Sequence, residues 1–380
     1  MPPTPKKLLI TAAILSATAM ASAEPLAPGE WAPEVSLGGH VFPAWVAVGA
    51  APGFPSAEAK SDAESIGDSG ACLAVLVAAP GAGATYSLDI RAAKGLAATT
   101  LSGVLDREGA MYRLQPRTDL SIGDLARLDS AEKIDVTFTL ALGDGAPMTK
   151  TLEATLHAPG DCPVAFDGEP RLAWTLAAFA DEDSRAVDRL VSDAERLGIA
   201  KSFSGAPGDS DEAIRRAFAL TIALGAEVKS FEESAWSDDN GLRAVAIRSH
   251  EDTLSDSGVT VADGALLLAA AFRKAGLNAV VAVDPPRLHA GIRPDDGGST
   301  LLLVDIEKLA LAEFDAGHSE PMLADLATAD TTLAARVEWP RFAAAANSAM
   351  KDYQANSSDW RVIELSAARE MGIMPLDIRD

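Results

Sequence analysis

Few side chains of this sequence could act as nucleophiles or as soft metal ligands. The chain has two cysteines, Cys72 and Cys162, and five histidines. Catalytic thiolates and zinc sites draw on these residue types, and zinc sites place them at short, regular spacings. Four histidines are scattered, with no pair at metal-ligand spacing: His40, His157, His250 and His318. The sequence therefore predicts no metal site and no cofactor, and we expect these four at surface or turn positions.

The two cysteines leave two alternatives open. Thiols in an oxidising compartment can form a disulfide. Pairing also requires the two residues to lie close together, and a sequence does not show this. We therefore expect either a Cys72–Cys162 disulfide or two buried free thiols.

The segment 247–306 combines a helix start with a distant histidine and carboxylate. Thr260-x-x-Asp263, ahead of an apolar run, is close to a capping box, in which the threonine hydroxyl accepts a hydrogen bond from a backbone amide. His289 lies in an extended run after this helix, and Asp305 directly follows the apolar residues of the next extended run. A histidine held by a carboxylate can act as a general base, so these residues are candidates for chemistry.

The order of these pieces resembles the core of the bacterial transglutaminase-like superfamily, which has the papain-type layout. In that family an arginine-containing lead-in precedes a Gly-x-Cys-x-Asp motif at a helix start, and later strands carry a His-Ala pair and an acidic residue. On this resemblance Asp263 matches the motif's aspartate, His289 the catalytic histidine and Asp305 the acidic third member. Val261 stands where the family has its cysteine.

Valine cannot replace the thiolate, because it has no ionisable group and no lone pair. Removing the nucleophile of a catalytic triad costs several orders of magnitude in rate. Thr260 is one residue away, and one residue turns a helical side chain by about 100°, so we favour a capping role for it over a nucleophilic one. His289 is either a core histidine bonded to Asp305 or a working base.

Three functions follow from this arrangement. The resemblance to a family whose nucleophile is missing predicts a non-enzymatic binding or scaffold protein, a pseudoenzyme. The second is a periplasmic hydrolase or peptidase in which His289 and Asp305 act with Thr260 or with water. The third is a structural component of the cell envelope without a ligand.

Residues 24–167 have the pattern of an all-β domain. Residues 133–141 alternate between apolar and polar side chains, Gly143-Asp144-Gly145 turns the chain, and residues 151–157 alternate again. The apolar run from Val41 to Val48 has strand length. Several short strands between turns predict a sandwich, which the resemblance suggests is immunoglobulin-like.

Residues 168–380 change to helical periodicity, after a linker expected around residues 161–171. Helices are predicted after Ser184, from about Ser210, over residues 260–275 and after Pro340, with extended runs at 278–284 and 300–306. The fold class expected for the chain is therefore α+β, with the second domain transglutaminase-like.

The first 23 residues have the features of a cleavable signal peptide. Lys6 and Lys7 precede an apolar stretch too short to span a bilayer, and Ala21-Ser22-Ala23 is a small-x-small cleavage site. No later stretch has 18 uninterrupted apolar residues. We therefore expect a periplasmic or secreted protein with no membrane span after cleavage.

The mature chain is strongly acidic. Removing Lys6 and Lys7 from 32 basic residues leaves 30 against 55 acidic ones, a net charge of −25. A field of this sign repels nucleic acids. The expected partner is instead a peptide, a protein or a cell-envelope component.

Overall fold

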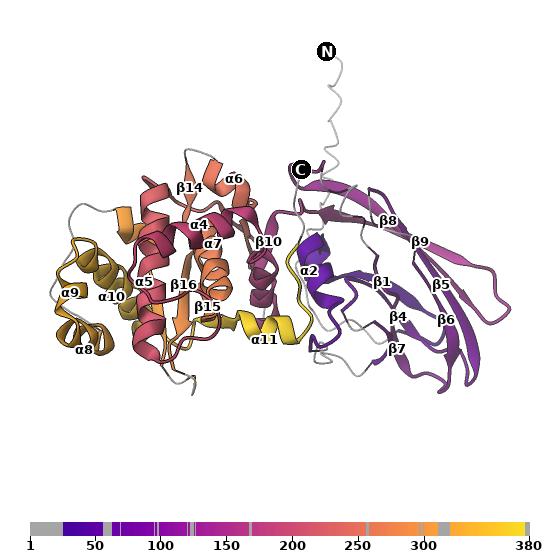
Figure 1. Cartoon of the computed structure of the whole chain (residues 1–380). Helices are drawn as coiled ribbons and strands as arrows, with labels where there is room; N and C mark the ends of the chain where they lie inside the picture. Colours follow the sequence, from indigo (N-terminus) through magenta and orange to yellow (C-terminus); the bar gives the residue numbers. More distant parts are fainter. Residues whose placement is uncertain are drawn as a thin grey trace, which may run out of the picture.

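The computed structural model describes residues 26–376, except 56–62, 69, 95, 97, 98, 120, 122–124, 126, 167, 168, 256, 257, 296, 297, 299 and 311–319. The predicted signal peptide and His318 lie outside the described residues. The described chain is α+β, with a β-rich unit beside a unit of helices and strands (Figure 1).

The first unit is a sandwich of two β-sheets that share one hydrophobic core. One sheet has the strand order β1 (Trp31–Val35), β4 (Leu73–Ala78), β7 (Met111–Gln115) and β3 (Glu64–Gly67). The other has the order β2 (His40–Val41), β9 (Met148–Leu156), β8 (Glu132–Leu142), β5 (Ala84–Ala92) and β6 (Thr99–Leu105). Val75 from the first sheet and Leu88 and Phe138 from the second belong to the same buried cluster.

The hairpin of β8 and β9 has the geometry that its alternating sequence predicts. Phe138 is fully buried. Thr137, on the other face of β8, lies with its hydroxyl 3.3 Å from that of Thr151 on β9. Gly143 has a φ of 55°, a left-handed value that glycine adopts without strain. One face of this hairpin is packed and the other is solvated, which is why its sequence alternates.

The apolar run from Val41 to Val48 is a helix for most of its length, not the predicted strand. After β2, α2 (Pro43–Gly49) begins at Pro43, whose ring fixes a helical φ and whose missing N–H is not needed at a helix start. This helix is apolar on more than one side because it lies between two cores. Val46 packs in the sandwich, whereas Trp45 packs in the second unit.

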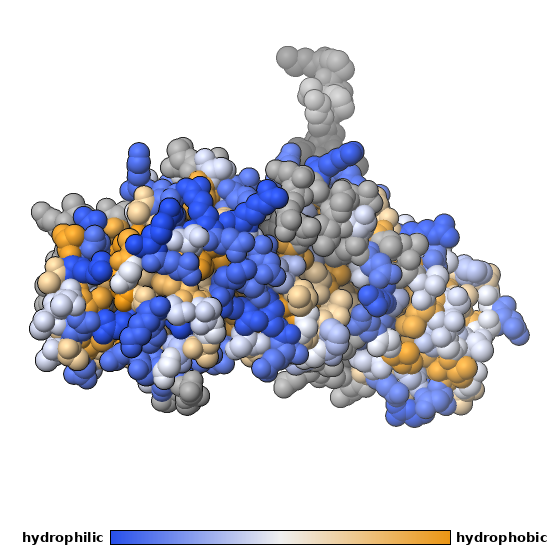
Figure 2. Space-filling model, viewed as in Figure 1, coloured by the Kyte–Doolittle hydropathy of each residue, from blue (hydrophilic) through white to orange (hydrophobic). Residues whose placement is uncertain are grey.

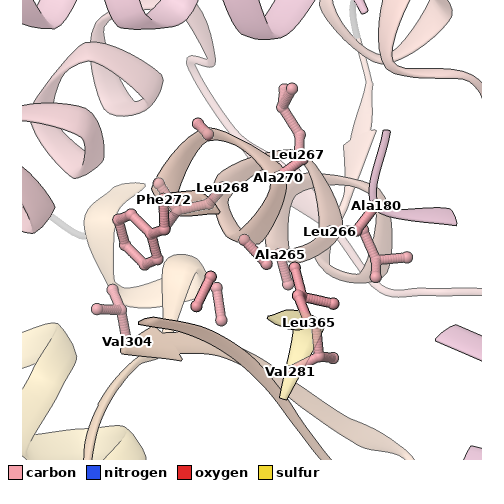
Figure 3. Packing of buried hydrophobic residues seen from close by; sticks show 14 of the residues in the cluster. Ala180, Ala265, Leu266, Leu267, Leu268, Ala270, Phe272, Val281, Val304 and Leu365 are labelled. Carbon is pink, nitrogen blue, oxygen red and sulfur yellow. The ribbon is translucent and has the colours of Figure 1, made fainter. Parts of the chain in front are cut away.

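The second unit is built on an antiparallel sheet with the order β17 (Leu302–Val304), β16 (Arg287–Arg293), β15 (Asn278–Asp284) and β18 (Arg361–Glu364). Helix α7 (Val261–Lys274) packs on one face. Figure 3 shows its Ala265 and Leu266 close to Val281 and Leu365. Helix α10 (Trp339–Ala355) packs against β17, and its Met350 joins a separate cluster on the opposite face of the sheet.

The remaining elements lie around this sheet, except for the short turn α1 (Ser36–Gly39), which contacts β1, β2 and β9 of the first unit. The helices around the sheet are η1 (Pro170–Phe179), α4 (Arg185–Arg196), α5 (Ser210–Glu227), α6 (His250–Ser255), η2 (Ile306–Ala310), α8 (Pro321–Ala329), α9 (Thr331–Ala334) and α11 (Leu365–Glu370). A small sheet has the order β10 (Asp161–Ala165), β13 (Leu242–Ala246) and β12 (Trp236–Asp239), and β11 (Phe231–Glu232) pairs with β14 (Val259–Thr260). Among the described helices, none has both the length and the apolarity needed to cross a bilayer.

The chain enters the second unit at β10, before the boundary expected at residues 167 and 168. Cys162 on β10 is fully buried in the core of the second unit, whereas Cys72 is buried in the sandwich core. The disulfide is therefore not formed, because each thiol packs in a different core, and both cysteines are free. Burial raises the pKa of Cys72 to about 11 and raises that of Cys162 as well.

Candidate functional site

The start of α7, where the transglutaminase-like family carries its nucleophile, is closed by hydroxyl groups of the chain itself. Thr260 is the N-cap, and its Oγ1 accepts a hydrogen bond from the Asp263 amide at 3.2 Å. This bears out the capping role predicted for Thr260. Ser234 Oγ accepts from the Ala262 amide at 2.8 Å. These are amides that a helix start could otherwise offer to an anion or an activated nucleophile.

Asp263 has a structural partner rather than a catalytic one. Its side chain is fully buried and accepts hydrogen bonds from the backbone amide of Arg248 at 2.9 Å and from Arg248 Nε at 2.8 Å. Arg248 Nη2 also donates to the Gly258 carbonyl at 2.6 Å. The arginine lead-in and the aspartate of the motif therefore form one ion pair, which fixes the segment before α7 to the first turn of that helix.

The space beside the first turn of α7 is filled by apolar side chains. The parallel pairing of β11 with β14 places Phe231 opposite Val259. A Cβ atom added to Gly264 would lie 2.6 Å from Ile306 Cδ1 and 2.8 Å from Phe231 Cε1. Val261, the first residue of α7, is partly buried and packs against the same core. The first turn of α7 is therefore packed on the side of Gly264, and Val261 contacts the core with part of its side chain exposed.

This packing predicts the sign of a mutational effect. Alanine in place of glycine normally stabilises a helix interior by about 0.5–1 kcal/mol, whereas overpacking a filled site costs about 1–3 kcal/mol. We expect Gly264→Ala to lower the free energy of unfolding by about 1–2 kcal/mol in urea denaturation.

The matched control is Gly225→Ala in α5, where the added Cβ atom would meet no atom within 4 Å. This variant should be unchanged or up to about 1 kcal/mol more stable. A Gly264→Ala protein as stable as the control would show that the first turn of α7 is not covered.

His289 lies on the face of the sheet opposite to α7. Side chains alternate along a strand, and the two neighbours of His289, Leu288 and Ala290, pack in the cluster that includes α7. His289 itself pairs with Ala282, which belongs to the cluster on the other face. Val261 and His289 are therefore separated by the sheet, and the residues that match the family's triad do not meet.

The imidazole of His289 is buried without a hydrogen-bond partner. Within the described chain neither of its ring nitrogens is bonded, and the same holds for Trp360 Nε1. The ring stacks on Trp360 with centroids 5.1 Å apart. Desolvation lowers the pKa of His289 to about 4, opposed by the charge of Asp352, so the ring is neutral at pH 7. A catalytic histidine is held by a carboxylate and faces a nucleophile, and the described residues around His289 supply neither contact.

Asp305 lies on the same face as His289 but is bonded elsewhere. Its Oδ2 accepts from Ser348 Oγ of α10 at 2.9 Å, and its Oδ1 accepts from the Glu307 amide at 3.2 Å. Burial raises the pKa of this carboxyl, although the bond from Ser348 lowers it. The His289–Asp305 bond considered from the sequence is therefore not formed, and Asp305 instead joins the end of β17 to α10.

The surface or turn position expected for His250 is wrong, whereas His40 and His157 are partly exposed. His250 is buried, and its Nε2 accepts from the Asp181 amide at 3.2 Å. His40 and His157 meet, with His40 Nδ1 2.9 Å from His157 Nε2. The sequence could have indicated this contact only through the parallel pairing of β2 with β9, which sets His40 beside Thr155. Among the described residues, no group of three or more His, Cys, Asp or Glu side chains could hold a metal ion.

Comparisons with family models, curated proteins and solved structures gave no significant match. The resemblance to the transglutaminase-like superfamily therefore depends on the residues of this chain alone. Two features that close the α7 start were not identified from the sequence: the hydroxyl of Ser234 and the side chain of Phe231. Both precede the motif by more than 20 residues and carry no spacing signal.

Proposed function

We propose that this chain is an exported, non-catalytic protein of the cell envelope. Its second domain is a degenerate transglutaminase-like domain that acts as a scaffold or binding module, beside an immunoglobulin-like sandwich. The observation that carries the proposal is the closed start of α7. Valine replaces the nucleophile, Thr260 and Ser234 accept from the amides of Asp263 and Ala262, and Phe231 lies against Gly264.

The hydrolase alternative has less support in the geometry. Its candidate nucleophile, the Thr260 hydroxyl, caps α7, and its candidate base, His289, faces the opposite side of the sheet. The acidic composition is accounted for by solubility and does not by itself point to a docking surface. Hydrophilic residues lie between smaller apolar patches on the helical unit on the face seen in Figure 2, and the full sequence has a net charge of −23.

Turnover assays test the absence of catalysis. We expect no hydrolysis or transamidation of peptides, glutamine amides or peptidoglycan fragments by the mature protein. We also expect none after a thiol is restored at the valine position in Val261→Cys, because His289 lies on the opposite face of the sheet. Turnover by either protein that is lost when His289→Phe is added would contradict the proposal.

A second experiment separates a binding role from a purely structural one. Crosslinking in the periplasm followed by affinity capture is expected to yield a defined peptide, protein or envelope partner. A capture that contains only the protein itself would favour the structural role without a ligand.

A further inference from the structure

Two histidines from distant parts of the chain form a linked pair where the sandwich meets the second unit. His40 is on β2, and His157 follows β9. The side chain of each is only 15% exposed, and the ring of Phe42 stacks on His157 with centroids 3.7 Å apart. Carboxylates stand at both ends of the pair, with Asp161 beside His157 and Asp239 of β12 beside His40.

The geometry between the rings is that of a hydrogen bond, not of a metal site. The ring centroids are 5.2 Å apart, close to the nitrogen–nitrogen distance of 2.9 Å plus the two ring radii. The two nitrogens therefore point at each other almost along one line. An ion midway between them would be about 1.5 Å from each nitrogen, whereas zinc–nitrogen bonds are about 2.0–2.1 Å. A proton fits this space and a metal ion does not.

Asp161 sets the direction of the hydrogen bonds. An ionised carboxylate only accepts, so His157 Nδ1, 3.3 Å from Asp161 Oδ2, carries the hydrogen. Nε2 of a neutral His157 is then an acceptor, which makes His40 Nδ1 the donor. This assignment from the hydrogen-bond network leaves His40 Nε2 with a lone pair 3.5 Å from Asp239 Oδ2.

Several groups bear on the charge of His40. Burial lowers its pKa most, and His157 lowers it further. Asp239 raises it, and Lys133 of β8 lowers it slightly. Lys133 is itself paired with Glu153 at 3.3 Å, and Asp161 lies beyond His157. Of these groups, Asp239 belongs to the second unit, so it is the one whose contact with His40 spans the two units.

We propose that His40 is a pH-dependent link between the sandwich and the β12–β13 hairpin. A proton taken up at Nε2 turns the lone pair that faces Asp239 into a charged donor. The bond from Nδ1–H to His157 is kept, because only one of the two rings is then charged. The link closes as the pH falls through the pKa of His40. A second proton on the pair would leave no acceptor nitrogen between the two rings and would break their hydrogen bond.

Histidine-selective NMR titration of the mature protein tests this link. At neutral pH the ¹⁵N shifts of His40 should show a protonated Nδ1 and a free Nε2. In Asp239→Asn the pKa of His40 should fall by about 0.2–0.7 pH units, since an exposed ion pair contributes about 0.2–1 kcal/mol. The matched control is Asp238→Asn, which removes the same charge from the same hairpin at a residue with no contact to His40.

Three results would overturn the proposal. One is a His40 tautomer with the hydrogen on Nε2 at neutral pH. Another is a His40 pKa that changes equally in the two hairpin variants. The effect of the substitution would then come from the change in net charge and not from a contact with His40. Stoichiometric Zn²⁺ binding that displaces the proton shared by both rings would also contradict it, because the pair would then be a metal site.

Discussion

Replacing Arg369 by leucine is expected to lower the free energy of unfolding by about 3–5 kcal/mol. Arg369 is only 9% exposed and holds the C-terminal helix α11 to η1 and the residues after it. Its guanidinium donates to the carbonyls of Ala177, Ala180 and Ile373 and forms a two-nitrogen contact with Glu182. Leucine would leave these carbonyls without their donor and Glu182 with one cationic partner fewer.

Glu182 shows how strongly this cluster is coupled. Desolvation alone would raise its pKa, yet the hydrogen bonds from Arg369 and Arg273 lower it to about 2. The control is Arg91→Leu on the sandwich, where the arginine side chain is 77% exposed and pairs with Asp89. That exposed variant should change stability by no more than about 0.5 kcal/mol in the same urea titration. Equal effects of the two substitutions would show that α11 is not held by Arg369.

Acidification from pH 7 to pH 5 is expected to destabilise the protein through two buried histidines. Desolvation lowers the pKa values of His289 and His250 to about 4 in the folded chain, whereas an unfolded histidine titrates near 6.5. As the pH falls below about 6.5, the unfolded chain binds protons first, so stability is lost down to about pH 4. Each histidine should account for about 2 kcal/mol at pH 5.

The variant His289→Phe isolates one of these contributions. Phenylalanine keeps a ring against Trp360 and removes two buried nitrogens that lack partners in the described chain. It should therefore be no less stable than the wild type at pH 7, and it should lose about 2 kcal/mol less between pH 7 and pH 5. Identical pH dependences of unfolding in the two proteins would show that His289 is not buried in its neutral form.

The sequence predicts those elements well that have one packed face. The hairpin of β8 and β9 alternates because its outer face is solvated. Helix α7 is buried on every side from Ala262 to Phe272 and could be placed from its ends instead, because Thr260 caps it and Gly276, with a φ of 76°, follows its last turn.

The face of His289 could not be predicted, for a physical reason. The interiors of β15 and β16 are buried on both faces, so apart from His289 itself their residues are apolar or small and carry no alternation. The sequence alone therefore does not indicate whether His289 or its neighbours face α7. The same limit applies to residues 43–48, whose burial in two cores made a helix look like a strand.

Contacts between distant segments were the other limit. Ser234 and Phe231 close the start of α7 through the pairing of β11 with β14, which is only two residues long. His40 and His157 are 117 residues apart in the sequence. Neither contact leaves a pattern in the local sequence. The triad positions could therefore be matched to those of a family, although the matched residues do not lie together in the structure.

The most direct measurement of the central claim is the thiol pKa of the Val261→Cys protein, taken from the rate of alkylation against pH. Wild-type protein serves as the blank, because Cys72 and Cys162 are buried thiols with raised pKa values. We predict the same thiol pKa with His289 present or replaced by phenylalanine, since the sheet separates the two positions. A pKa below about 7 that returns toward 8.5 only when His289 is replaced would reveal a thiolate–imidazolium pair and contradict the account.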